Sequence, residues 1–333
     1  MRFSLFAAWA SLGLGYAATH NKYSDDWSFD LDSAENPAWM SGLDDNVPLS
    51  MLSIPGTHNS VTDRFGEYNT QSQNVPLETQ LISGIRYFDI SCRDLFFNLM
   101  VYHGSSSTGY DLREVLNTIF NFLDKHPRET VILRIQKGKF TERSDTFVQH
   151  LERLLDPETH LGDRAVKRIF SKGDAGITAI PTLGEVRGKV FILQDFKTRV
   201  PGRYGLPWRS SAMSVYNFKL ILKAFLVELK WHAVKGFIEL IPSRGSEKLC
   251  ITHTSISVGA KPIEIAAGSE GKAGMNRYLG EYLSSKNKAP NGVTERVGII
   301  AMDFPGKSLI KQILKLNKVH QVTPPAGLPG RPS

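Results

Sequence analysis

The chain has few cysteines: only Cys92 and Cys250 occur among its 333 residues. Two cysteines cannot build the disulfide framework that stabilises small secreted domains. We expect both thiols to be buried and unpaired, because one lies in an early apolar segment and the other in a late one. The sequence also has no Asn-X-Ser/Thr sequon and no visible internal repeat, so we expect neither N-glycosylation nor a repeat architecture.

Long apolar runs are scarce as well. One run covers residues 3–16, directly after Met1-Arg2, and ends near Gly15-Tyr16-Ala17. It is shorter than the roughly 20 residues that span a bilayer, and its positive start and small-residue end are typical of a cleaved signal. We therefore predict a signal peptide over residues 1–18 and a secreted, soluble protein. A membrane anchor is the less favoured alternative.

The charge balance is basic but not extreme, with 40 Lys and Arg against 33 Asp and Glu, a net charge of +7. Removing the predicted signal peptide removes only Arg2 among charged residues and leaves +6. This excess is spread along the chain, so it favours weak contact with an anionic surface and does not indicate nucleic acid. The composition, 41% hydrophobic and 22% charged, is that of a globular protein, and we expect a monomer.

Apolar segments alternate with helical patterns through most of the chain. The clearest helical pattern covers residues 111–126, and the segments that read as strands are 49–54, 85–92, 131–136, 190–194, 238–241, 248–254 and 297–302. This alternation predicts a single α/β domain over residues 46–318, with a parallel sheet closed into a (β/α)8 TIM-type barrel. Residues 19–45 form a polar N-terminal segment, and residues 319–333, rich in proline, a flexible tail.

Two histidines stand where strands are expected to end. His58 closes the stretch Ser-Ile-Pro-Gly-Thr-His-Asn-Ser of residues 53–60, in which proline and glycine end a strand with a rigid turn. His103 follows an apolar pair and precedes Gly104. Two imidazoles at one rim suggest a general base and a general acid. A loop histidine that only satisfies backbone groups is the alternative for each one taken singly.

Acidic and basic side chains gather at the same predicted rim. The two-residue period of a strand puts Asp89, Ser91 and Arg93 on one face, and Arg134 and Gln136 on one face of the next strand. Two further carboxylates end apolar segments: Asp195 and Asp303. One such residue can merely mark where a strand reaches water, but several at one rim favour a functional site.

These motifs resemble the phosphatidylinositol-specific phospholipase C X-domain family, in its secreted bacterial and fungal branch. The likeness runs from about residue 48 to 315 and rests on the His58 stretch, Gly-Ile-Arg-Tyr-Phe-Asp-Ile at 84–90, and Tyr-His-Gly at 102–104. It implies a distorted, incompletely closed barrel. It also implies that His58 removes a proton from an inositol hydroxyl, which attacks phosphorus to give a cyclic inositol phosphate and diacylglycerol.

In this resemblance His103 protonates the leaving oxygen, Asp303 orients His58, and Asp89 orients His103. The chain departs from the bacterial pattern at Ser91, Gln136 and Asp195, where the family carries basic residues. We expect Arg93, Arg134 or Lys137 to meet the phosphate instead, with Gln136 and Asp195 also near the substrate.

Asn59 replaces the bacterial aspartate and matches a calcium-binding asparagine of the eukaryotic relatives. Asn59 and Asp89 are therefore candidate calcium ligands, although calcium takes six to eight oxygens. We expect that no cofactor is required, with calcium as the alternative.

The leading hypothesis is a secreted phospholipid phosphodiesterase that contacts the membrane surface peripherally. The alternatives are a catalytically weak homologue that binds a lipid head group or a glycan, and a magnesium-dependent phosphodiesterase on a similar barrel. Two smaller expectations accompany it. We interpret His253 as a packed histidine rather than a ligand. Phe96, Phe97 and Met100 form either the apolar face of a hairpin, which we favour, or a contact with acyl chains.

Overall fold

The computed structural model describes residues 25–65, 70–138, 144–218, 220–221, 226–256, 258–269, 271–288 and 295–322. The predicted signal peptide over residues 1–18 lies outside this part of the chain. Within it, none of the helices has the length and apolar character needed to cross a bilayer.

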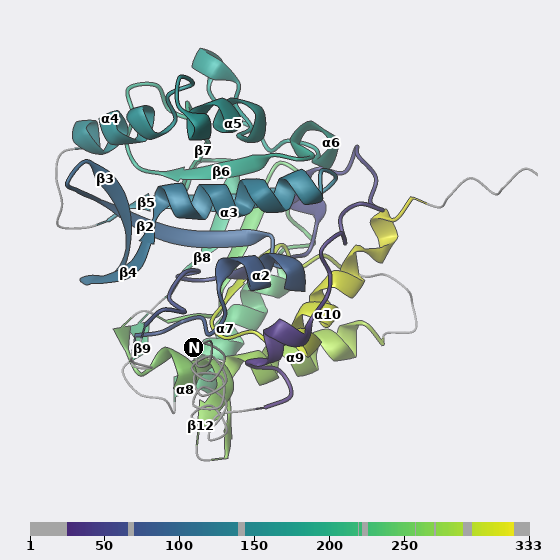
Figure 1. The fold of residues 1–333 in the computed structure, drawn as a ribbon. Helices are drawn as coiled ribbons and strands as arrows, with labels where there is room; N and C mark the ends of the chain where they lie inside the picture. Colours follow the sequence, from purple (N-terminus) through teal and green to yellow (C-terminus); the bar gives the residue numbers. More distant parts are fainter. Residues whose placement is uncertain are drawn as a thin grey trace, which may run out of the picture.

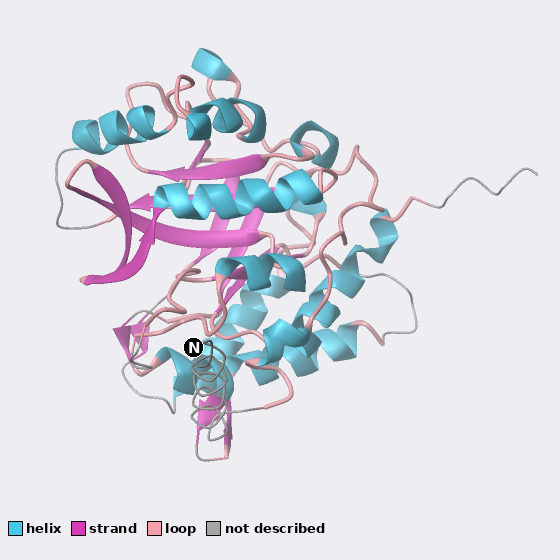
Figure 2. Ribbon diagram, viewed as in Figure 1, coloured by secondary structure: helices cyan, strands magenta, loops and turns pink. Residues whose placement is uncertain are grey.

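Eight parallel strands form a curled sheet that helices surround (Figures 1 and 2). Their order in space is β7-β6-β5-β2-β1-β14-β10-β8, which is chain order around a ring. Among the described residues β7 and β8, at the two ends, do not pair, so the barrel is open between them. The predicted distorted barrel is confirmed. The strands are β1 Ile54–Thr57, β2 Tyr87–Leu95, β5 Val131–Lys137, β6 Val190–Asp195, β7 Leu206–Pro207, β8 Met213–Tyr216, β10 Leu249–His253 and β14 Ile299–Met302.

Helices connect most of these strands. The expected helix at 111–126 is α3, and Asp111 caps it by accepting a hydrogen bond from the Glu114 amide. The strand expected at 238–241 is wrong, because Ile238 lies on the buried face of a helix. The helices are α2 Leu77–Ser83, α3 Leu112–Lys125, α4 Ser144–Leu154, α5 His160–Arg168, α6 Leu183–Val186, α7 Val227–Glu239, α8 Pro262–Ala267, α9 Met275–Lys286 and α10 Lys307–Lys315.

A hairpin and two small sheets complete the fold. Strand β3 (Asn98–His103) pairs antiparallel with the end of β2 and with β4 (Ser106–Asp111). The short strands β9 (Leu220–Ile221) and β11 (Val258–Gly259) pair with each other, as do β12 (Gly268–Ser269) and β13 (Lys272–Ala273).

The strands separate two apolar layers because successive side chains point to opposite faces. On β2, Phe88 and Ile90 belong to the layer between sheet and helices, whereas Tyr87 lies in the layer inside the barrel. Cys92 and Cys250 are both buried free thiols, as the sequence predicts. The inner apolar layer fills the interior of the barrel. A site can therefore open only beyond this layer, at the carboxyl ends of the strands.

The N-terminal segment is fixed to the barrel by a buried ion pair. Arg86 and Glu129 lie 2.9 Å apart with side chains 0% and 1% exposed. Arg86 also donates to the Pro37 carbonyl, and Glu129 accepts from the Met40 amide. Breaking such a pair costs about 3–5 kcal/mol, because it leaves one buried charge uncompensated.

The chain's other end also meets this segment. Residues 316–320 form a short 3-10 helix, and the Val322 amide donates to the Gly42 carbonyl. The predicted boundary between domain and tail at residue 318 is therefore early by a few residues, and residues 323–333 lie outside the described part.

Candidate active site

A layer of polar side chains lies directly above the inner apolar layer. On each of several strands the residue two positions beyond an inner apolar residue is polar, since the inward face recurs at every second position. Asp89 follows Tyr87 in this way, and Arg134 follows Ile132. The layer comprises His58 (after β1), Asp89 (β2), Arg134 (β5), Asp195 (β6), His253 (β10) and Asp303 (after β14).

His58 is oriented by Asp303. The Nδ1 atom of His58 lies 2.9 Å from an Asp303 carboxylate oxygen, and both side chains are almost completely buried. A carboxylate accepts a hydrogen bond from Nδ1–H, which fixes one tautomer and leaves Nε2 as the basic nitrogen. The contact between His58 and Asp303 is the one that the family resemblance implies.

Two buried amides fix the backbone beneath this pair. The Gln73 side chain donates to the carbonyls of His58 and Met302, at 2.8 and 2.9 Å, and so ties the ends of β1 and β14 together. Asn276 donates to the Asp303 carbonyl at 3.0 Å. Sequence reasoning missed both residues, because nothing in their local pattern distinguishes a buried amide from a solvated one.

The second histidine lies beside the first. The ring centroids of His103 and His58 are 6.5 Å apart, and His103 is half-buried at the end of β3. Its Nδ1 atom lies 2.8 Å from the Thr70 carbonyl, and its ring stacks on Phe65. A backbone carbonyl, rather than the expected Asp89 carboxylate, therefore holds Nδ1 of His103. A carbonyl at Nδ1 also fixes the tautomer. Its oxygen can only accept a hydrogen bond, so Nδ1 must carry the hydrogen that is donated.

Asp89 is held by Arg134 instead. The guanidinium of Arg134 contacts both Asp89 oxygens at 3.0 Å, and its opposite edge lies 2.5 Å from Asp195. It also stacks on Trp208, with 4.0 Å between the guanidinium carbon and the ring centroid. Burial alone would lower the pKa of Arg134, but the two carboxylates and Tyr87 outweigh it and raise that pKa. Arg134 is thus a permanent cation between two carboxylates.

The other predicted substrate ligands lie around this layer. Arg93 donates to the Gly104 carbonyl and stacks on Tyr102, so it supports the turn after His103. Gln136 is half-buried and pairs in register with Ser91, while Lys137 is half-buried one position further along β5. The structure brings Arg134 and Asp195 together and places Arg93 on the hairpin.

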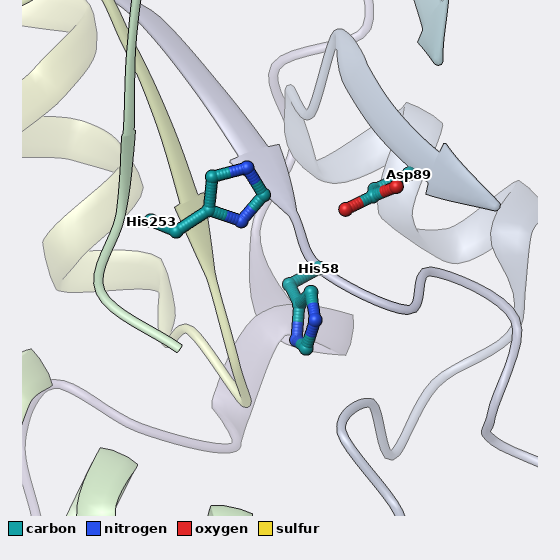
Figure 3. Close-up of side chains that lie close together, drawn as sticks. All are labelled: His58, Asp89 and His253. Carbon is teal, nitrogen blue, oxygen red and sulfur yellow. The ribbon is translucent and has the colours of Figure 1, made fainter. Parts of the chain in front are cut away.

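His253 is fully buried, which agrees with the expectation of a packed histidine, and it packs within the polar layer. Its ring centroid lies 5.8 Å from that of His58, and Figure 3 shows the side chains of His253 on β10, His58 after β1 and Asp89 on β2 close together. One ligand atom from each of the three falls within 4.8 Å of the others. The signal was available in the sequence, because His253 has the same parity as the inner residues Leu249 and Ile251.

This cluster does not suit calcium. Two of its three donors are imidazole nitrogens, whereas calcium takes oxygen ligands. Asp89 already accepts from Arg134 through both oxygens, and Asn59 adds one half-buried amide. Among the residues that the structure describes, Asn59 and Asp89 therefore do not belong to a cluster of several carboxylates, which calcium sites usually have.

An open parallel barrel with two histidines and buried carboxylates at its carboxyl edge has the groups for acid–base chemistry. Residues 46–195 match the family model of the phosphatidylinositol-specific phospholipase C X domain. A 1-phosphatidylinositol phosphodiesterase of Listeria monocytogenes is 30% identical over 307 residues, covering 86% of this chain and 87% of the relative. The chain belongs to the phosphatidylinositol-specific phospholipase C X-domain family.

Further comparisons agree in length and fold. A 1-phosphatidylinositol phosphodiesterase of Staphylococcus aureus is 29% identical over 316 residues and is covered to 95% of its length. The solved structure of the phosphatidylinositol-specific phospholipase C from Listeria monocytogenes superposes with a TM-score of 0.70 at 27% identity. That match covers 85% of this chain and 98% of the solved one.

We predict that Asp303→Asn disturbs the tautomer of His58. An amide can donate as well as accept, so it no longer enforces a proton on Nδ1. Imidazole ¹⁵N NMR of the wild type should show one dominant His58 tautomer, with the hydrogen on Nδ1. The variant should show a mixture of the two tautomers, or mainly the one with the hydrogen on Nε2. Asp195→Asn is the matched control, because Asp195 contacts Arg134. An unchanged His58 spectrum in the Asp303 variant would contradict the orienting role.

Proposed function

We propose that this protein is a phosphatidylinositol-cleaving phosphodiesterase that releases diacylglycerol and a cyclic inositol phosphate. The observation that carries the proposal is the pair of oriented histidines, His58 on Asp303 and His103 on a backbone carbonyl, at the carboxyl edge of the barrel. The names of the relatives support the same activity, since they are 1-phosphatidylinositol phosphodiesterases that match most of this chain.

In the proposed reaction His58 accepts the proton of the inositol 2-hydroxyl through Nε2. The resulting oxygen attacks phosphorus and forms the cyclic phosphodiester, and the bond from phosphorus to the glycerol oxygen breaks. His103 donates a proton to that leaving oxygen. In-line displacement at phosphorus needs a base on the attacking side and an acid on the leaving side, and positioned groups of this kind contribute about 10²–10⁴ each.

The charges of the polar layer suit a head group that carries hydroxyls. The polar layer holds three carboxylates: Asp89 and Asp195 contact the guanidinium of Arg134, and Asp303 contacts His58. Carboxylates accept hydrogen bonds from hydroxyl groups, and Asp195 is the most exposed of the three at 24%. We assign Asp195 to contact with inositol hydroxyls, and Arg134 to positioning Asp89 and Asp195.

The proposed reaction needs no metal ion. The two histidines carry the proton transfers, and protonated His103 supplies positive charge beside the phosphate in place of a cation. The two imidazoles in the cluster around Asp89, and the engagement of both Asp89 oxygens by Arg134, support this assignment.

We predict that His58→Ala or His103→Ala lowers kcat on phosphatidylinositol by at least about 100-fold, because each removes one proton-transfer group. The fold should persist, since both residues lie at strand ends; circular dichroism and thermal unfolding check this. His253→Phe is the control: it keeps a ring beside His58 but removes the imidazole, and we expect it to retain most of the activity.

Near-normal turnover in either alanine variant would remove that histidine from the mechanism. A wild type that cleaves no phosphatidylinositol, yet binds vesicles that contain it, would favour the alternative of a head-group-binding homologue without catalysis.

We further propose that the protein is secreted after removal of residues 1–18. The support is the sequence of that segment, with a positive start, a short apolar run and small residues before position 18. Intact-mass analysis of protein from the culture medium of an expressing cell should give a chain that begins at Thr19. Retention of the full-length chain inside the cell would contradict this.

A further inference from the structure

Two phenylalanines form the tip of the hairpin between β2 and β3. Phe96 and Phe97 are 84% and 71% exposed, and the preceding Leu95 is 40% exposed. Our expectation that these rings form the packed apolar face of a hairpin is therefore wrong. Single exposed apolar residues are common, but three in succession at a projecting turn form a patch that needs an explanation.

The backbone of this turn is strained as well. Phe96 and Phe97 have φ angles of 49° and 68°, in the left-handed region that bulky side chains rarely adopt. Two-residue hairpin turns with positive φ at both positions strongly prefer Asn-Gly or Asp-Gly. Asn-Gly at this turn would make the folded state more stable than Phe-Phe does, because it would remove both the strain and the exposed apolar surface. Residues that lower the stability of the fold in this way often serve binding.

The tip projects beyond the carboxyl edge of the barrel, the edge that carries the candidate active site. Strand β2 pairs with β5 as far as Cys92 and Lys137, and then continues through Leu95 beyond the end of β5. Three further residues carry the tip about 10 Å past the paired edge. The returning strand β3 ends at His103, so one hairpin carries both the exposed aromatic pair and a candidate catalytic histidine. Figure 1 shows this hairpin reaching past the sheet to lie beside α4.

The hairpin is anchored, and its surroundings include exposed basic groups. Asp94 on β2 and His150 on α4 form a buried pair at 2.6 Å, which holds the stem of the hairpin against the helix. The Arg153 guanidinium lies 5.8 Å from the Phe97 ring, and Arg113 lines the same small groove, which also includes Asp111. Aromatic side chains flanked by arginines match a lipid surface, where rings enter the interface and guanidinium groups meet phosphates.

We propose that Leu95, Phe96 and Phe97 form a docking tip that inserts into the surface of an anionic phospholipid bilayer. This inference rests on the proposed function, because a lipid substrate requires the candidate active site to face a membrane. Insertion gives the exposed rings an apolar environment, while the Asp94–His150 pair holds the stem of the hairpin against α4. The arginines add attraction to anionic head groups within about a Debye length.

The test compares a double variant, F96N plus F97G, with L229S. Asn-Gly suits the positive φ angles, so the double variant should unfold at a higher temperature than the wild type. Leu229 is similarly exposed, at 67%, but lies on α7. Vesicles of phosphatidylcholine and phosphatidylserine, without phosphatidylinositol, report docking independently of catalysis. We expect the double variant to lose at least about tenfold in vesicle partitioning, and L229S to change little.

In the double variant we expect the unfolding temperature to rise and vesicle partitioning to fall. These opposite changes distinguish a membrane role of the two phenylalanines from a structural role. Equal partitioning of the wild type and the double variant would overturn the proposal, as would a wild-type dimer in sedimentation that the double variant abolishes. Activity is a separate measurement. The double variant should cleave phosphatidylinositol in vesicles more slowly than the wild type does, but should cleave a short-chain monomeric substrate at the same rate. If neither substrate is cleaved by the wild type, the proposed function fails, while the vesicle measurement still decides the docking tip.

Discussion

The site depends on the two-residue repeat of parallel strands around an incompletely closed barrel. Because every second side chain faces inward, the apolar layer inside the barrel and the polar layer above it come from the same faces of the same strands. Ile132 closes the interior and Arg134 stands above it; Ile299 and Ala301 precede Asp303 in the same way. Strand pairing in register then places Asp89 directly opposite Arg134, although the two residues are far apart in the sequence.

Within that layer, buried charges are placed so that each carboxylate has a defined partner. Asp303 meets His58, and Asp89 and Asp195 meet the two edges of Arg134. Removing one partner from such a pair leaves an uncompensated charge, which costs more than the pair contributes. The arrangement therefore fixes side-chain positions before substrate arrives, and preorganised charge of this kind is a large part of enzymatic rate enhancement.

Much of this could be predicted from the sequence, because parity and strand ends are local signals. They identified His58, Asp89, Arg134 and Asp303, and the order of strands and helices gave the barrel. Partners across the sheet were harder to predict, since they depend on register and side-chain reach. Asp89 was assigned to His103, yet Arg134 holds it, and the carbonyl that holds His103 belongs to Thr70. Backbone carbonyls carry no signature in the sequence.

The error at the hairpin tip has a different origin. The prediction followed the usual behaviour of adjacent phenylalanines, which is to form an apolar packing face. In the structure Phe96 is 84% exposed instead. Tertiary placement overrides such preferences most often where a residue serves binding or catalysis, so this deviation is itself informative.

The central claim is that two oriented histidines cleave a phosphatidylinositol lipid without a metal ion. The most direct measurement is phosphorus NMR of the product formed from phosphatidylinositol vesicles, with a chelator in one sample and added calcium in another. The account predicts a cyclic inositol phosphate at similar rates in both samples. No cyclic phosphate in either sample, or its formation only with calcium, would contradict it.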